Sequence, residues 1–358
     1  MNRPRLLHLV PLAALALGVG LATAAPASAA ATTYTITNLG SLGGGVTLGT
    51  AINASGQVTG YSLSSTQVQV PCHGKHHPTT CFTNPYDAFV WSNGTMTSLG
   101  TLGGTLSEGV AISGSGEVVG FSTTTVTGPS TGVPFLWNGH SMTALSEPTG
   151  ADGINDSGQI AGQCFDAELT QTTPCVVSSS GAITELGVSN PDIICLYIDT
   201  LPAAGPSADA INDSGQVLGN CPVGDNEYAA IVWTNDTPTV LPTLGGASAL
   251  GTAISSNGLV VGTSTTSTGA EDGFLWSNGT MTDLGSTFSP AAVNASGVIV
   301  GGQFVYSNGT LQNLNNLIPA GSGYTIQSAT GINDNGQIVA DATDTATGQT
   351  QALLLNPS

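Results

Sequence analysis

Residues 210–219 read AINDSGQVLG, and variants of this phrase recur along the whole chain. Each copy has a short apolar step, then Asn or Ser, then a Ser-Gly or Asn-Gly turn, then a β-branched strand. Seven copies occur, at residues 51–60, 111–120, 153–162, 210–219, 253–262, 292–301 and 331–340. A phrase that returns at a period of about 20–50 residues is typical of solenoids, propellers and arrays.

A second phrase follows most copies of the first. It reads AFVWSNGTMTSLG at residues 88–100, and related copies begin at residues 134, 176, 230, 273 and 303. Asn-Gly between apolar runs is a strong hairpin signal, because a tight primed turn needs positive φ at both central residues. One repeat therefore predicts four strands, named a to d here: AIN lies on a, QVLG on b, FVW on c and MTSLG on d.

The predicted strand c carries one aromatic residue at the same position in most repeats. Trp91, Trp137, Trp233 and Trp276 are all the Trp residues of the chain, and Tyr306 takes this place in the sixth repeat. An aromatic residue that recurs once per unit indicates packing between neighbouring units. The third copy, at residues 176–187, has no aromatic residue.

The seventh repeat ends after its strand c, at residues 352–355, and its missing strand d stands near the N-terminus at residues 34–40. A ring would pair these two strands and leave no open sheet edge. We therefore predict an all-β fold, a seven-bladed β-propeller of four-stranded blades that is closed by its terminal strands. The expected blades are listed by residue: 45–100, 101–146, 147–187, 188–242, 243–285, 286–316, and 317–358 with 33–44.

The first residues are typical of a secretory signal peptide. Arg3 and Arg5 precede an apolar stretch, and Ala27-Ser28-Ala29 fits the small-x-small cleavage rule. We expect residues 1–29 to be removed and residues 30–358 to form one secreted, extracellular domain. No later segment is long and apolar enough to suggest a membrane span.

The expected mature chain is strongly acidic. It keeps one cation, Lys75, and all 22 acidic residues, so its formal charge is 1 − 22 = −21. Binding of nucleic acid or of an anionic membrane requires Lys and Arg, so both are excluded as partners. A neutral polysaccharide or a cationic surface or protein is the more plausible partner, and we expect a monomer.

The connections differ in length in a regular way. The predicted a–b and c–d turns are short, whereas the b–c connection at residues 63–86 and the d–a link at residues 188–208 are long. In a propeller these two sets lie on opposite faces. Binding residues concentrate on variable loops over a rigid scaffold, so the b–c/d–a face is the expected binding face.

Six cysteines in a secreted chain indicate disulfides. The repeat register places Cys72 and Cys81 in one b–c loop and sets Cys164 at the end of a strand b, before Cys175 on the next strand c. Cys195 and Cys221 remain, so the expected pairs are Cys72–Cys81, Cys164–Cys175 and Cys195–Cys221.

The other chemical signals are sparse. His73, His76 and His77 cluster in the first b–c loop and could hold Cu or Zn, but a solvated loop bounded by a disulfide is the favoured explanation. No nucleophile elbow or carboxylate dyad is evident, so no catalytic and no cofactor-binding residue is assigned. A bound divalent cation is the one cofactor that these residues leave open.

The paired phrases resemble the bacterial extracellular HAF repeat family, named after the His-Ala-Phe that begins its strand-c motif. The matching runs are SLGTLGG at residues 98–104, AINDSGQVLG at residues 210–219 and DAFVW at residues 87–91. The His of the name is replaced here, for example by Asp87, Val133 and Asp272. The resemblance implies a secreted repeat protein and supplies no catalytic residues.

These observations favour a secreted, non-catalytic binding or surface-interaction module that uses the b–c/d–a face. The alternative is a metal-dependent propeller hydrolase or lyase with carboxylates around the central channel. A weaker third reading is a metal-binding protein that uses the His73 loop. A catalytic propeller should gather carboxylates at the channel, whereas a binding module should present an uncharged or aromatic surface.

Overall fold

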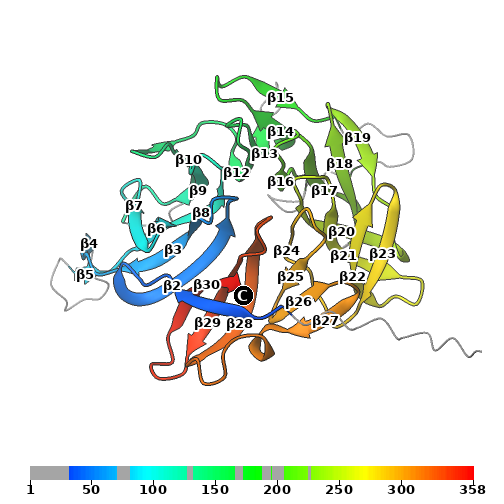
Figure 1. Ribbon diagram of the computed structural model, residues 1–358. Helices are drawn as coiled ribbons and strands as arrows, with labels where there is room; N and C mark the ends of the chain where they lie inside the picture. The colour runs from blue at the N-terminus through cyan, green and yellow to red at the C-terminus, as the bar shows by residue number, and fades with distance from the viewer. Residues whose placement is uncertain are drawn as a thin grey trace, which may run out of the picture. The chain divides into compact units, whose positions relative to one another are not determined.

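The fold was analysed in a computed structural model, which describes residues 32–70, 81–126, 132–165, 172–187, 195, 205–224 and 227–358. Thr32–Ser358 form one compact unit, and the predicted signal peptide lies outside the described residues. Seven four-stranded antiparallel sheets surround a central axis (Figure 1). The chain is therefore a seven-bladed β-propeller, as the repeats predict.

Each blade orders its strands from the axis outward in the predicted sequence a, b, c, d. Blade 1 contains β2 (Gly43–Ile52), β3 (Val58–Ser64), β6 (Tyr86–Ser92) and β7 (Thr95–Gly100). Blade 2 contains β8 (Ser107–Ile112), β9 (Val118–Ser122), β10 (Val133–Trp137) and β11 (Met142–Ala144). Blade 3 contains β12 (Gly150–Ile154), β13 (Ile160–Phe165), β14 (Thr172–Val177) and β15 (Ile183–Glu185).

Blades 4 to 6 repeat the same order. Blade 4 contains β16 (Ala210–Ile211), β17 (Val217–Gly224), β18 (Glu227–Thr234) and β19 (Thr237–Val240). Blade 5 contains β20 (Gly245–Ile254), β21 (Val260–Thr266), β22 (Glu271–Ser277) and β23 (Thr280–Gly285). Blade 6 contains β24 (Ala292–Val293), β25 (Ile299–Gly301), β26 (Phe304–Ser307) and β27 (Thr310–Asn313). A 3₁₀ turn, η1 (Leu314–Asn316), follows blade 6, and a small hairpin of β4 (Val68–Val70) and β5 (Cys81–Thr83) extends the first b–c loop.

Blade 7 joins the two ends of the chain. It contains β28 (Tyr324–Ile332), β29 (Ile338–Asp344) and β30 (Thr350–Pro357), and its outer strand is β1 (Tyr34–Asn38). Ile36 pairs with Leu355 as Met281 pairs with Trp276 in blade 5, so the displaced strand takes the predicted register. Figure 1 shows the first strand lying beside the last.

The turn chemistry explains why the hairpins form. Asn93 and Gly94 both adopt positive φ, at 49° and 85°, as a primed turn requires, and Asn278-Gly279 and Asn308-Gly309 do the same. The fourth position of every a–b turn is a glycine with φ between 69° and 88°, a region that side chains disfavour. These residues fix the strand lengths and therefore the size of a blade.

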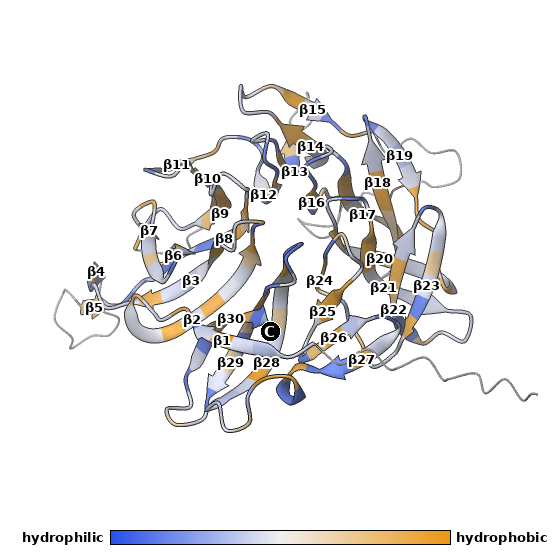
Figure 2. Cartoon of the chain, in the orientation of Figure 1, coloured by the Kyte–Doolittle hydropathy of each residue, from blue (hydrophilic) through white to orange (hydrophobic). Residues whose placement is uncertain are grey.

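The hydrophobic core consists of separate layers between neighbouring blades. Trp91 of blade 1 packs with Val339 and Leu354 of blade 7, and Trp276 packs against a cluster that includes Leu218 of blade 4. The predicted packing role of the strand-c aromatic residues is therefore confirmed. In Figure 2 the hydrophobic residues are concentrated on the strands, whereas the turns that meet near the axis are hydrophilic.

Candidate functional site

The seven a–b turns meet around the axis on one side of the propeller, which we call the turn face. Each turn starts with a buried polar residue, and these are Asn53, Ser113, Asn155, Asn212, Ser255, Asn294 and Asn333. The Oδ1 atom of Asn53 accepts hydrogen bonds from the backbone N–H groups of Ser55 (3.1 Å) and Gln57 (2.9 Å). Asn commonly satisfies the backbone of a turn in this way.

The asparagines also link each blade to the next, which the sequence reasoning missed. The side-chain N–H of each Asn donates to the backbone carbonyl of the equivalent residue in the following blade. The bonds are Asn53 to Ser113 (2.8 Å), Asn155 to Asn212 (3.1 Å), Asn212 to Ser255 (3.0 Å), Asn294 to Asn333 (3.2 Å) and Asn333 to Asn53 (3.0 Å). Ser113 and Ser255 have no amide to donate. We call this set the asparagine ring.

Three carboxylates follow ring positions and line a cavity of about 200 Å³ at the turn face. Asp213 accepts from the backbone N–H of Asp156 at 2.9 Å, and Asp334 accepts from that of Ala295 at 2.8 Å. Asp156 accepts in the same way from Gly114. These carboxylates therefore hold neighbouring turns together, and their hydrogen bonds explain their presence without a ligand.

A second group of carboxyl groups belongs to the inner part of blades 3 and 4, with Asp152 on β12 and Asp209 directly before β16. Asp209 accepts hydrogen bonds from the Ser207 hydroxyl (2.8 Å) and the Asn220 amide (2.7 Å). Burial raises the pKa of Asp209, and these two hydrogen bonds oppose the rise. Burial, with a smaller contribution from the charge of Asp209, raises the pKa of the adjacent Asp152 to about 6.

Asp341 of β29 occupies the seam between the last blade and the first. Its Oδ1 atom accepts from the backbone N–H of Gly49 at 2.9 Å, and the residue is 9% exposed. Burial raises the pKa of Asp341 to about 6, and the Gly49 hydrogen bond opposes the rise. Asn220 stands at the same position in blade 4, where it accepts from Gly251 N–H (2.8 Å) and also donates to the Gly251 carbonyl (2.9 Å).

Two further groups with a raised pKa lie in blades 1 and 2. Burial raises the pKa of Glu108 on β8. Burial also raises the pKa of Tyr61 on β3, with further contributions from the charges of Glu108 and Asp341. These groups can hold protons at a pH where solvated carboxyl groups are ionised. Sequence reasoning missed Tyr61 because the charges that act on it, those of Glu108 and Asp341, belong to the neighbouring blades, while the repeat alignment compares residues at equivalent positions.

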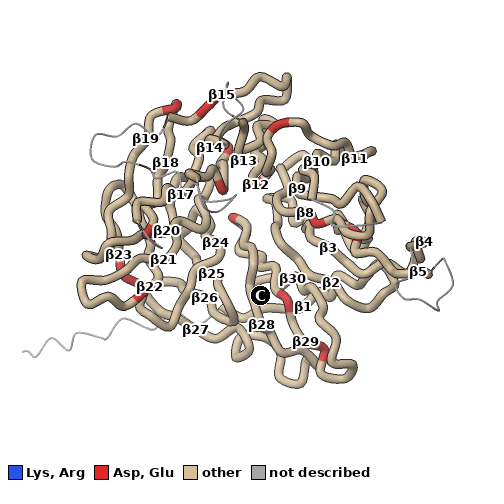
Figure 3. The backbone as a smooth tube through the Cα atoms, turned by 180° about the vertical axis from the view of Figure 1, so that it is seen from behind, with Lys and Arg blue, Asp and Glu red and all other residues tan. Residues whose placement is uncertain are grey.

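The channel gives no assembled metal centre among the described residues. No group of three or more His, Cys, Asp or Glu side chains in that part of the chain is placed to hold a metal ion. The same part of the sequence contains acidic residues but neither Lys nor Arg, as Figure 3 shows. The described helical segments include none with the length and hydropathy of a membrane span.

The b–c and d–a connections gather on the opposite side, the loop face. Phe82 is 63% exposed on the β4–β5 hairpin, Phe165 is 46% exposed where β13 ends, and Tyr228 is 37% exposed where β18 begins. Among the residues that the structure describes, three of the five exposed large apolar side chains therefore stand at b–c connections, in blades 1, 3 and 4. Exposed aromatic side chains on the variable loops of a rigid scaffold are available for contact with a partner.

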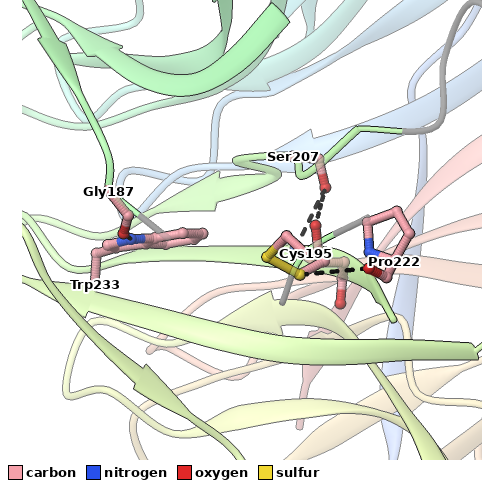
Figure 4. The surroundings of a disulfide bond; sticks show 7 residues. Gly187, Cys195, Ser207, Pro222 and Trp233 are labelled. Carbon is pink, nitrogen blue, oxygen red and sulfur yellow. Dashed lines mark hydrogen bonds between the residues drawn. A yellow bond between two sulfur atoms is a disulfide. The ribbon is translucent and has the colours of Figure 1, made fainter. Parts of the chain in front are cut away.

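Two of the predicted disulfides are present, Cys164–Cys175 and Cys195–Cys221. Cys81 is also disulfide-bonded, whereas its predicted partner Cys72 lies outside the described residues. Figure 4 shows the second bridge beside Pro222, close to Trp233. His73, His76, His77 and Lys75 also lie outside the described residues, so the metal-ligand prediction stays a prediction.

Comparison with known proteins identifies no family for this chain. No family model and no curated protein sequence matches the chain. Solved structures that resemble it include TolB from Acinetobacter baumannii, with 12% identity, a TM-score of 0.42, and coverage of 85% of this chain and 64% of TolB. The β-propeller domain of the Trilobed protease from Pyrococcus furiosus has 8% identity, a TM-score of 0.49, and coverage of 87% and 97%. The chain therefore spans less than two thirds of the length of TolB.

Proposed function

We propose that this protein is a secreted, non-catalytic binding module that recognises its partner through the loop face. The observation that carries the proposal is the exposure of Phe82, Phe165 and Tyr228 at three b–c connections of a rigid, closed scaffold. Aromatic side chains offer a large apolar surface that loses little entropy on binding. The interblade hydrogen bonds would keep that scaffold fixed while a ligand binds.

The negative charge of the chain limits the chemical class of its binding partner. With Lys75 as the single cation after residue 29, the surface repels polyanions. A neutral polysaccharide suits aromatic rings on loops, and a cationic protein or surface would be attracted by the carboxyl groups. Of the two, the neutral polysaccharide is the one that the exposed aromatic residues favour.

The proposed location rests on disulfides and on the N-terminal sequence. Two disulfides are typical of an oxidising compartment, which means outside the cell or in the periplasm. Residues 1–29 have the order of features found in a secretory signal peptide. We also propose that the chain is a member of the HAF repeat family, because its repeated runs of sequence match those of that family.

A glycan array probed with the purified mature protein tests the proposed function. We expect binding to a class of neutral glycans and no retention on heparin or on anionic vesicles in the presence of a chelator. Retention on heparin under those conditions, or no glycan signal together with turnover of a substrate, would contradict the proposal.

A second candidate function rests on the interacting carboxyl groups of Asp152 and Asp209, at the inner strands of blades 3 and 4. They would serve a metal-dependent hydrolase or lyase that acts at the central channel. Metal analysis of the purified protein separates the two ideas. One tightly held divalent ion per chain that is lost in an Asp152→Asn/Asp209→Asn variant would support the enzyme, whereas the binding module should show no such dependence.

A further inference from the structure

Blade 3 is the one blade whose strand c carries a small residue at the aromatic position. Val177 pairs with Ile160 across β13 and β14, as Trp233 pairs with Val217 in blade 4. The other blades place larger residues there, namely Trp91, Trp137, Trp276, Tyr306 and Leu355. The interface that Val177 should fill lies between blade 3 and blade 2.

Trp233 shows what the missing side chain would do. It is fully buried, and it packs in one cluster with Val176 and Leu186 of the preceding blade. Its indole N–H donates to the backbone carbonyl of Gly187 at 2.7 Å, as Figure 4 shows. Under this indole Val176 and Leu186 are only 8% and 4% exposed.

The equivalent interface between blades 2 and 3 contains a cavity. The residues that match Val176, Leu186 and Gly187 are Leu136, Leu145 and Ser146, and all three line a cavity of about 420 Å³ with Val177. Leu136 and Leu145 stay partly exposed. The cavity falls within the size range of small-molecule sites, which is about 300–1,000 Å³.

The cavity combines apolar walls with an unpaired carboxylate. Ile160 and Ile183 contribute to the walls, and Ile183 is 48% exposed. Glu117 and Glu147 also line the cavity, and the Oε2 atom of Glu147 is buried without a hydrogen-bond partner. A buried carboxylate oxygen without a partner is costly, and no Lys or Arg occurs in the described part of the chain to neutralise it.

We propose that this cavity between blades 2 and 3 binds a small aromatic amine. The flat ring would occupy the place of the missing indole against Leu136 and Leu145, and the ammonium group would pair with Glu147. Gly181 of the c–d turn of blade 3 and Glu147 of the d–a connection between blades 2 and 3 both line the cavity. Phe82, Phe165 and Tyr228 do not line it, so the proposal does not depend on the proposed loop-face function.

Isothermal titration with tryptamine tests the proposal on the mature protein. We expect saturable binding of one tryptamine per chain, and binding at least tenfold weaker to the Glu147→Gln variant. Glu185→Gln is the matched control, because Glu185 is exposed on β15 and does not line the cavity. That variant should bind tryptamine as the unmodified protein does.

A second variant tests the place of the ring. Val177→Trp restores the side chain of the other blades, so it should abolish tryptamine binding and raise the melting temperature. Absence of saturable binding to the unmodified protein would overturn the proposal. Equal affinity for the Glu147→Gln and Glu185→Gln variants would overturn it as well, and this second result does not depend on how Val177→Trp folds.

Discussion

The side chain of Asn333 donates a hydrogen bond to the backbone carbonyl of Asn53 at 3.0 Å, although the two residues lie 280 positions apart. This bond joins the last a–b turn to the first. The propeller is therefore closed twice, by β1 in the outer layer of blade 7 and by the asparagine ring at the axis. The scaffold that carries the loop face is therefore closed both at its outer edge and near its axis.

The Asn333→Ala variant should be less stable by about 2 kcal/mol, because it loses the interblade bond and the turn bonds to Asn335 and Gln337. Asn333→Ser should lose about half as much, since Ser113 and Ser255 form the same turn without an amide. Urea unfolding of the three proteins gives the comparison. An Asn333→Ser variant as stable as the unmodified protein would show that the interblade bond adds nothing.

The ring also predicts a stabilising change. Ser113→Asn would supply the missing amide between blades 2 and 3, facing the carbonyl of Asn155. We expect a gain of about 1 kcal/mol, measured as a shift of the urea midpoint at unchanged slope. A loss of stability would mean that the gap at Ser113 is required by its surroundings.

Leu39 tests closure in the outer layer. It is 4% exposed and packs in one cluster with Trp91 of blade 1 and Leu354 of blade 7. Leu39→Ala should reduce the free energy of unfolding by about 3 kcal/mol, the usual cost of emptying a buried leucine site. Leu250→Ala is the control, because Leu250 is 39% exposed and should cost well under half as much.

Asp341 predicts how stability depends on pH. Its pKa is raised in the folded protein from 3.8 to about 6, so the folded state holds a proton that the unfolded chain has already released. The stabilisation is complete below the unfolded pKa and is lost as the pH rises through about 6. Asp341→Asn should therefore raise stability at pH 8, by on the order of 2 kcal/mol, and flatten the profile between pH 4 and 7.

Another blade already has an Asn at the position that corresponds to Asp341. Asn220 binds both the N–H and the carbonyl of Gly251 at the equivalent seam between blades 4 and 5. An Asp341→Asn variant that is less stable at pH 8 than the unmodified protein would contradict the assignment. Thermal unfolding at several pH values decides the point.

The sequence predicts the blades and their closure because both depend on local patterns. Asn-Gly turns, glycines in tight turns and the displaced strand at Ile36 can be recognised directly in the sequence. The residues that contact one another across two blades cannot be recognised in this way. The role of Asp341 depends on Gly49, at the other end of the chain, and the asparagine ring depends on carbonyl groups that every residue has. Val177 is an intermediate case, since the missing aromatic residue is visible in the repeat but the cavity is not.

The most direct test of the account is to titrate the best neutral oligosaccharide from the glycan array against three proteins. These are the unmodified protein, a Phe165→Ser/Tyr228→Ser variant of the loop face, and a His140→Ala variant of the exposed c–d turn on the turn face. The account predicts at least tenfold weaker binding to the loop-face variant and unchanged binding to the turn-face variant. Unchanged affinity for the loop-face variant, with loss of affinity in the turn-face variant, would contradict it.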